Sequence, residues 1–169
     1  MENTMANTKS PTQLLSDDHR AVLRKLDALE KIYGNLDKKD QVSAELKDLT
    51  EFFKTEFWVH FTKEEDALFP EMETFIPRNA GPIGVMLMEH DDLRKTNDII
   101  QKAVTDYLGG DNSEATKKTL QEHGGHFIEL LKNHIDKEDN ILFMMANMHL
   151  SQAQMDKING LFATIEKTN

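Results

Sequence analysis

Two stretches of the chain repeat a histidine and a glutamate four residues apart. One begins at His60 and reads HFTKEEDALFP; the other begins at His134 and reads HIDKEDNILFM. They agree in register at His, Lys, Glu, Leu and Phe. Because residues four apart on an α-helix lie on one face, His60–Glu64 and His134–Glu138 each present a nitrogen and an oxygen donor to one neighbour. Such donors suit iron, manganese or zinc better than magnesium or calcium.

Two further histidines stand in matching contexts. His19 lies in SDDHRAVLRKLD and His90 lies in LMEHDDLRKTND, each directly after an acidic residue. Each of these segments precedes one of the two His–Glu stretches. The chain therefore divides into two similar halves, and each half offers two histidines and one glutamate.

All six side chains fall on apolar helical stripes, which are expected to face a protein core. The residues in line with His60 and Glu64 are Leu46, Leu49, Phe53, Phe57, Ala67 and Leu68. Those in line with His134 and Glu138 are Phe127, Leu130, Leu131, Ile141, Leu142 and Met145. His19 and His90 lie in line with Leu15, Val22, Leu23, Leu26, Ile83, Met86, Leu87 and Leu93.

A metal centre accounts for this pattern. A single H-x-x-x-E spacing is typical of an ion pair on a helix surface, but here it recurs with matched flanks and two more histidines. Burying an unpaired carboxylate costs free energy, whereas a cation binds carboxylates and neutral imidazoles together. Four histidines and two glutamates suffice for two ions if Glu64 and Glu138 bridge them and each ion receives two histidines. An open position would then remain for a small ligand.

Helical periodicity and short connections predict the elements that hold these residues. Pro11 after Ser10 begins a helix that the Gly34-Asn35 pair ends, and further helices are predicted over residues 40–77, 83–108, 114–149 and 152–167. Ser113 and Ser151 are the expected N-caps of the last two. With no strand alternation, the sequence predicts an all-α, antiparallel up-down four-helix bundle with a short C-terminal fifth helix. We expect a flexible N-terminus over residues 1–12 and a single domain over residues 13–169.

Two positions interrupt the helical patterns. Pro70 lies inside the second predicted helix and is expected to kink or end it. Gly124 and Gly125 lie inside the fourth, where a kink, a close packing point and the true helix start are all compatible with the sequence.

The composition of the chain limits its possible partners, metal sites and location. The 169 residues are 38% hydrophobic and 30% charged, with a net charge of −10, which argues against nucleic acid or an anionic membrane as a partner. The absence of cysteine excludes disulfides, iron–sulfur clusters and thiolate zinc sites within the chain. Neither a signal peptide nor an apolar run of membrane-spanning length is visible, so a cytoplasmic location is expected.

The chain resembles the hemerythrin-like, or HHE cation-binding, family over about residues 14–149. The resemblance rests on DDH ending at His19, HFTKEEDALFP, GPIGVMLMEH ending at His90, and NHIDKEDNILF. It implies a hemerythrin-type bundle and a non-haem di-iron centre, with zinc or manganese as alternative metals. The ligands that it implies are the six that the helical faces select: His19, His60, Glu64, His90, His134 and Glu138.

Three positions differ from the oxygen carriers of that family or add to their pattern. Those proteins have a second histidine on the third helix, where this chain has Arg94, which either pairs with a site carboxylate or extends to solvent. Their fourth helix uses H-x-x-x-x-D, which would select Asp139; we favour Glu138 because its spacing repeats that of Glu64. His126 is a less favoured seventh ligand, because it lies about two turns from His134 and some 80° round the helix.

The leading functional hypothesis is a di-iron protein that binds or senses a small diatomic ligand, most simply O2. The alternatives are a di-iron oxidoreductase acting on O2, peroxide or NO, and a protein for iron storage or delivery. Arg94 favours the oxidoreductase over simple oxygen carriage, because one histidine fewer makes the centre resemble di-iron carboxylate enzymes. Related iron–sulfur repair proteins usually carry a cysteine-bearing N-terminal segment, so a repair role is not expected here. A metal-free interaction bundle is disfavoured by the buried ligands.

Overall fold

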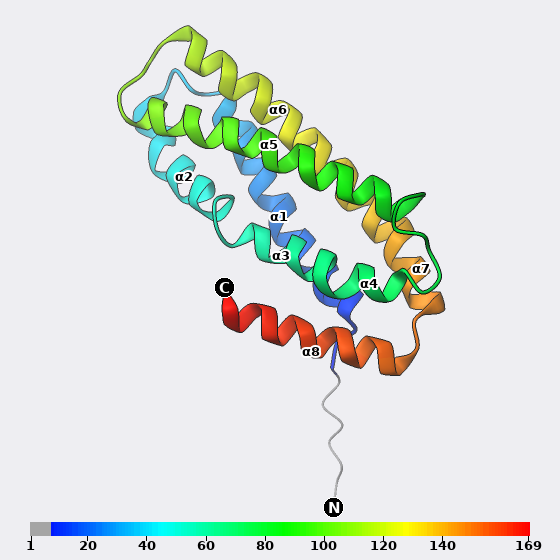
Figure 1. Cartoon of the computed structure of the whole chain (residues 1–169). Helices are drawn as coiled ribbons and strands as arrows, with labels where there is room; N and C mark the ends of the chain where they lie inside the picture. The colour runs from blue at the N-terminus through cyan, green and yellow to red at the C-terminus, as the bar shows by residue number, and fades with distance from the viewer. Residues whose placement is uncertain (1–7) are drawn as a thin grey trace, which may run out of the picture.

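The computed structural model describes residues 8–169, and in that range it is helical with no strand. Four segments form an antiparallel bundle, and a fifth helix lies along its side (Figure 1). The expected fold is therefore confirmed. The flexible N-terminus expected over residues 1–12 falls mostly outside the described residues, and the first helix begins at Pro11. The α-helices are α1 (Pro11–Tyr33), α2 (Lys39–Phe52), α3 (Phe57–Lys63), α4 (Phe69–Met72), α5 (Pro82–Leu108), α6 (Glu114–Lys137), α7 (Phe143–His149) and α8 (Gln152–Thr168).

Two π-helical segments interrupt the second and fourth segments of the bundle. They are η1 (Glu64–Leu68), between α3 and α4, and η2 (Glu138–Leu142), between α6 and α7. Serine side chains cap the helices at the expected places: Ser113 accepts a hydrogen bond from the backbone N–H of Thr116, and Ser151 forms a capping box with Gln154.

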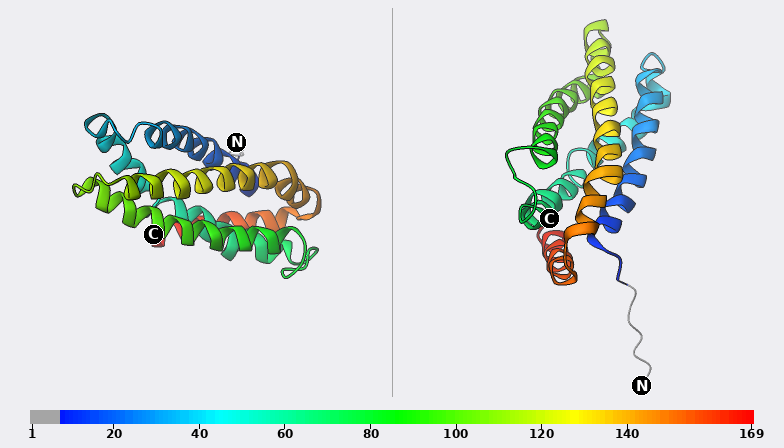
Figure 2. Two further views of the ribbon diagram at one scale, coloured as in Figure 1. Left: turned by 90° about the horizontal axis from the view of Figure 1, so that it is seen from above. Right: turned by 90° about the vertical axis from the view of Figure 1, so that its right-hand side faces the viewer.

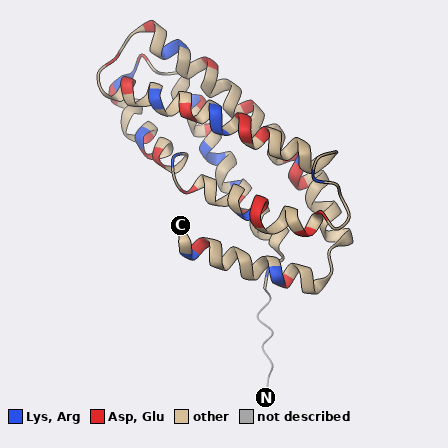
Figure 3. Ribbon diagram, viewed as in Figure 1, with Lys and Arg blue, Asp and Glu red and all other residues tan. Residues whose placement is uncertain are grey.

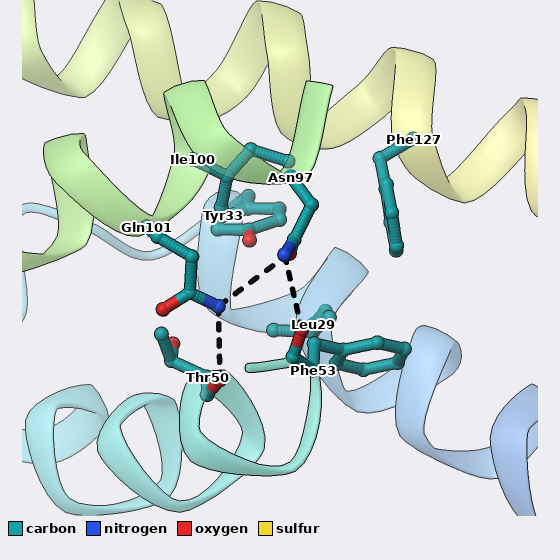
Figure 4. A pocket seen from close by; sticks show the side chains of 8 residues that line it. All are labelled: Leu29, Tyr33, Thr50, Phe53, Asn97, Ile100, Gln101 and Phe127. Carbon is teal, nitrogen blue, oxygen red and sulfur yellow. Dashed lines mark hydrogen bonds between the residues drawn. The ribbon is translucent and has the colours of Figure 1, made fainter. Parts of the chain in front are cut away.

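The second segment is not the continuous helix predicted over residues 40–77. It turns through residues 53–56, between α2 and α3. Phe53 O accepts hydrogen bonds from Trp58 Nε1 at 2.8 Å and Asn97 Nδ2 at 3.0 Å, and Gln101 Nε2 donates to Thr50 O at 3.0 Å. These side chains satisfy carbonyls that the end of α2 leaves without helical partners. A cavity of about 10 Å³ lies beside them (Figure 4).

The two positions flagged in the sequence resolve differently. Pro70 lies in the first turn of α4, directly after η1, where proline is tolerated. Gly124 lies inside α6 and is a close packing point, because a Cβ there would lie 2.4 Å from Cε2 of Tyr33. Gly125 has nothing within 4 Å of such a Cβ.

The apolar core consists of two clusters, one on each side of the level of the histidines. One is built around Leu26, Leu46, Phe53, Leu93 and Leu131, and the other around Leu15, Leu68, Met72, Ile83 and Leu142. Along each bundle segment the predicted ligands fall between members of the two clusters. A polar layer therefore crosses the middle of the core.

Helix α8 covers one side of this layer. It packs against α1, α3 and η1, and Figure 2 shows the same arrangement from two further directions. Ile158 and Phe162 of α8 are buried in the second core cluster. Lysine, arginine, aspartate and glutamate residues are spread along the helices (Figure 3). No described helix has the length and apolar character needed to cross a membrane.

Candidate metal centre

The six side chains singled out by the sequence meet in the polar layer, and all six residues are buried. Their histidines form two pairs through inward-facing Nε2 atoms. His19 and His60 approach to 3.1 Å, and His90 and His134 approach to 3.2 Å. The cluster therefore has two halves, which we call the His19/His60 half and the His90/His134 half.

Each glutamate reaches one histidine of each half. Glu64 Oε1 lies 2.9 Å from His60 Nε2 and 3.9 Å from His90 Nε2. Glu138 contacts His134 Nε2 through Oε1 and lies 3.7 Å from His19 Nε2 through Oε2. Both carboxylates thus lie between the halves, where a bridging ligand would be needed.

No hydrogen bond satisfies these two carboxylates. All four oxygens of Glu64 and Glu138 are buried, and none accepts a hydrogen bond in the described part of the chain. Burial and the charge of Glu138 raise the pKa of Glu64 well above its usual value. Burial favours a lower pKa for His134, but contacts with Glu138, Glu89 and Glu64 raise its pKa to about 10. The cluster thus has an excess of acceptors at its centre, which positive charge would relieve.

Both glutamates begin a π-helical turn. The backbone N–H of Phe69 donates to Glu64 O, and that of Phe143 donates to Glu138 O, five residues apart in each case. The extra residue in each π-helical turn rotates the side chains that follow it about the helix axis. Ile141, which α-helical periodicity places in the core, is 52% exposed, while Phe143 and Ala146 are buried. The prediction was wrong at Ile141 for this reason.

A second set of carboxylates surrounds the histidines. Each histidine contacts one of them through Nδ1, on the side away from the centre. The pairs are His19 with Asp139 at 2.8 Å, His60 with Asp18 at 3.2 Å, His90 with Glu65 at 3.3 Å, and His134 with Glu89 at 3.1 Å. An ionised carboxylate only accepts hydrogen bonds. When a histidine is neutral, as metal binding requires, its Nδ1 therefore donates to this carboxylate and the Nε2 lone pair faces the centre.

These contacts form a closed ring around the bundle. Asp18 on α1 supports the histidine of α3, Glu65 on η1 supports that of α5, Glu89 on α5 supports that of α6, and Asp139 on η2 supports that of α1. Sequence reasoning missed this role, although each of these acids is the immediate neighbour of a predicted ligand.

The structure also places Arg94, Asp139 and His126, whose roles the sequence leaves open. Arg94 pairs with a site carboxylate: its Nη1 and Nη2 donate to Glu65 at 2.9 and 2.7 Å. Asp139 contacts the outer nitrogen of His19 and not the centre. His126 is half-exposed and lies 3.2 Å from Asp92, outside the cluster.

Aromatic rings from the two core clusters cover the histidines of the polar layer. Phe61 stacks on His90 with ring centroids 3.7 Å apart, and Phe143 stacks on His19 at 5.6 Å. Both phenylalanines are buried, so the imidazole faces contact hydrocarbon and not water.

A comparison of the chain with known protein families agrees with this arrangement of histidine and glutamate side chains. The model of the hemerythrin HHE cation-binding domain matches residues 10–146. The chain belongs to this family. Within the described residues, Glu64, His90, His134 and Glu138 form one group whose spacing could hold a cation, and His19, His60 and Glu138 form another. Membership of the HHE family and this buried cluster together indicate a metal site.

Curated relatives of this HHE chain are named iron-sulfur cluster repair protein YtfE. That of Dickeya chrysanthemi is 34% identical over 140 residues, which cover 77% of this chain and 60% of the relative. Those of Salmonella schwarzengrund and Salmonella newport are each 34% identical over 88 residues, covering 52% of this chain and 40% of the relative. The chain thus spans about three-fifths or less of the length of these relatives.

Proposed function

We propose that this protein is a non-haem di-iron protein that binds or senses a small ligand, most simply O2. The observation that carries the proposal is the pair of buried carboxylates, which have no protein donor and each reach both histidine pairs. We propose His19, His60, Glu64, His90, His134 and Glu138 as the ligands, with both glutamates bridging. Zinc and manganese suit the same donors.

The residues of the chain would contribute positioning and exclusion of water. The outer carboxylates hold each imidazole with Nε2 inward, and Phe61 and Phe143 cover two of the rings. If bound by these residues, a pair of iron ions would supply electrons to a small ligand. The apolar walls would favour a small uncharged molecule over a hydrated anion. We propose a single domain over residues 13–169 and a cytoplasmic location.

A second candidate is an oxidoreductase that uses the same centre on O2, peroxide or NO, including in iron–sulfur cluster repair. The names of the curated relatives favour it. Repair, which was not expected from the sequence, therefore returns as an alternative. Iron storage or delivery is the third candidate.

Adding oxygen to the anaerobically reduced, iron-loaded protein distinguishes these candidates. A spectrum that forms with oxygen and reverses on its removal supports binding. Repeated consumption of O2, peroxide or NO supports the oxidoreductase, and reactivation of a damaged iron–sulfur enzyme supports repair. Fewer than one metal ion per chain after anaerobic iron loading would contradict every form of the proposal.

A further inference from the structure

We propose that the two halves of the cluster hold their cations unequally, and that the cation of the His19/His60 half exchanges first, through a groove beside His60. This inference rests on the proposed di-metal function and adds to it a difference between the two metal positions. The difference arises in the residues that support the histidines and in the surface next to each half.

Cations support the outer carboxylates of the His90/His134 half. Glu65 forms a two-point ion pair with Arg94, whose guanidinium lies 5.9 Å from the ring centroid of Trp58 and 5.8 Å from that of Phe61. Glu89 forms an ion pair with Lys137. Both carboxylates are mostly buried, with 19% and 14% exposed. Each histidine of this half is therefore held by a carboxylate that is itself fixed on its far side.

The outer carboxylates of the His19/His60 half lack this support. Among the described residues, neither Asp18 nor Asp139 forms an ion pair with a lysine or arginine; Asp139 accepts a hydrogen bond from Ser16 Oγ at 2.8 Å. Their side chains are 46% and 32% exposed. Water competes for these oxygens, so the imidazoles that they support are held less firmly.

A groove of about 210 Å³ reaches the His19/His60 half from outside. Its lining contains four polar residues, Asp18, Glu56, His60 and Lys63, together with five apolar ones. The side chain of His60 is 7% exposed, the largest fraction among the four histidines. Glu166 of α8 engages Lys63 at 2.6 Å, which partly offsets its charge. Two carboxylates therefore remain to attract a cation at the one histidine that solvent touches most.

The surface next to the His90/His134 half is unsuitable for a cation. A groove of about 260 Å³ lies there, and its lining is apolar except for Lys137. Met86 and Leu142 of this lining are buried and lie about one turn from His90 and Glu138. A hydrated cation entering here would lose water to hydrocarbon, and the lining offers no carboxylate to replace that water.

Chelator-driven release from the anaerobic, Fe²⁺-loaded full chain tests the inference, with an iron(II)-specific chromogenic chelator counting ions against time. Loading is measured first, because two ions per chain support the proposed function independently of how they leave. We expect two phases of one ion each, the first at least tenfold faster, in line with the roughly 10–100-fold effects of groups that support metal ligands. Asp18→Ala is expected to accelerate only the fast phase, and Arg94→Gln only the slow phase, each by roughly tenfold or more.

Two further variants keep the test decisive. Lys137→Gln should repeat the effect of Arg94→Gln, because it removes the other supporting cation, and it replaces that variant if Arg94→Gln does not fold. Arg78→Gln is the matched control, since Arg78 pairs with Glu73 and contacts no carboxylate of the ring; it should change neither phase. Release of both ions at one rate, or acceleration of the fast phase by Arg94→Gln, would overturn the inference. Loading below one ion per chain would overturn the proposed function as well.

Discussion

Glu64 and Glu138 are the only acidic residues of the described chain that are fully buried, and each touches both halves of the cluster. In the proposed di-metal centre a residue in that position would bind both ions, so its loss would remove more than one contact. The histidines differ in this respect, because each faces one partner histidine and is held by one outer carboxylate.

Glu138→Ala is expected to lower metal content from about two ions per chain to one or none, because one bridge and its charge disappear. Glu64→Ala should behave in the same way. Metal analysis of the native-purified variants provides the measurement. Glu122→Ala is the matched control, since Glu122 is exposed and faces only Lys118, at 3.7 Å. Full retention of both ions in either bridge variant would show that the bridging assignment is wrong.

At the scale of the element, helix geometry explains both the success and the limits of sequence reasoning. Counting α-helical faces predicts six inward side chains, and all six are buried in one cluster, because α1, α3, α5 and α6 are regular up to these residues. The count fails at Ile141, because nothing in EDNIL marks a π-turn, and it fails at residues 53–56, where the chain has neither glycine nor proline. That break depends on Asn97 and Gln101, more than 40 residues away, and local propensity contains no information about them.

The two adjacent glycines of α6 give opposite predictions. Gly124→Ala should destabilise the protein by about 1–2 kcal/mol, because overpacking against the ring of Tyr33 outweighs the gain in helix propensity. Gly125→Ala should stabilise it by up to about 1 kcal/mol, because its Cβ meets nothing and alanine favours the helix. Urea unfolding of both variants measures the difference. Equal effects of the two substitutions would contradict the close-packing assignment.

Asp111, in the loop before α6, is expected to titrate at a lower pH than an ordinary aspartate. Hydrogen bonds from the Ser113 and Thr116 side chains and from the Ser113 backbone N–H lower the pKa of Asp111 to about 2. The folded pKa lies below the ordinary value of 3.8, so this carboxylate stabilises the fold above that value, and the contribution is lost as the pH falls toward 2. An NMR titration of the Asp111 carboxyl carbon measures the midpoint. The Asp111→Asn variant is the control, because it has no carboxyl group at this position to titrate. A midpoint near 3.8 would show that the capping contacts do not persist in solution.

At the scale of the whole molecule, the polar layer divides the core into two clusters that do not merge. A bound cation would therefore contribute to stability as well as to function, because the alternative is a set of buried oxygens without partners. Helix α8 lies beyond residues 10–146, the range of the family match, yet it contributes Ile158 and Phe162 to one of the clusters. Helix α8 is thus part of the core next to the polar layer.

Metal removal should lower the melting temperature. A cation present at 100 times its dissociation constant stabilises the folded state by about 2.7 kcal/mol, which corresponds to roughly 5–10 °C for a chain of this size. Calorimetry of the loaded and chelator-treated protein measures the shift. In the double variant Glu64→Leu/Glu138→Leu the dependence on metal should disappear, because apolar residues of similar volume remove the buried charges. Unchanged melting of the native chain on chelation would contradict a structural contribution of the metal.

The ring of outer carboxylates has a geometric consequence of its own. Every contact in it joins two different segments of the bundle, and none lies within a single helix. Sliding one segment along its axis by a single residue, about 1.5 Å, would stretch two of the four contacts at the same time. The ring therefore sets the longitudinal alignment of the four segments, while the helix ends above and below it remain free to differ in length.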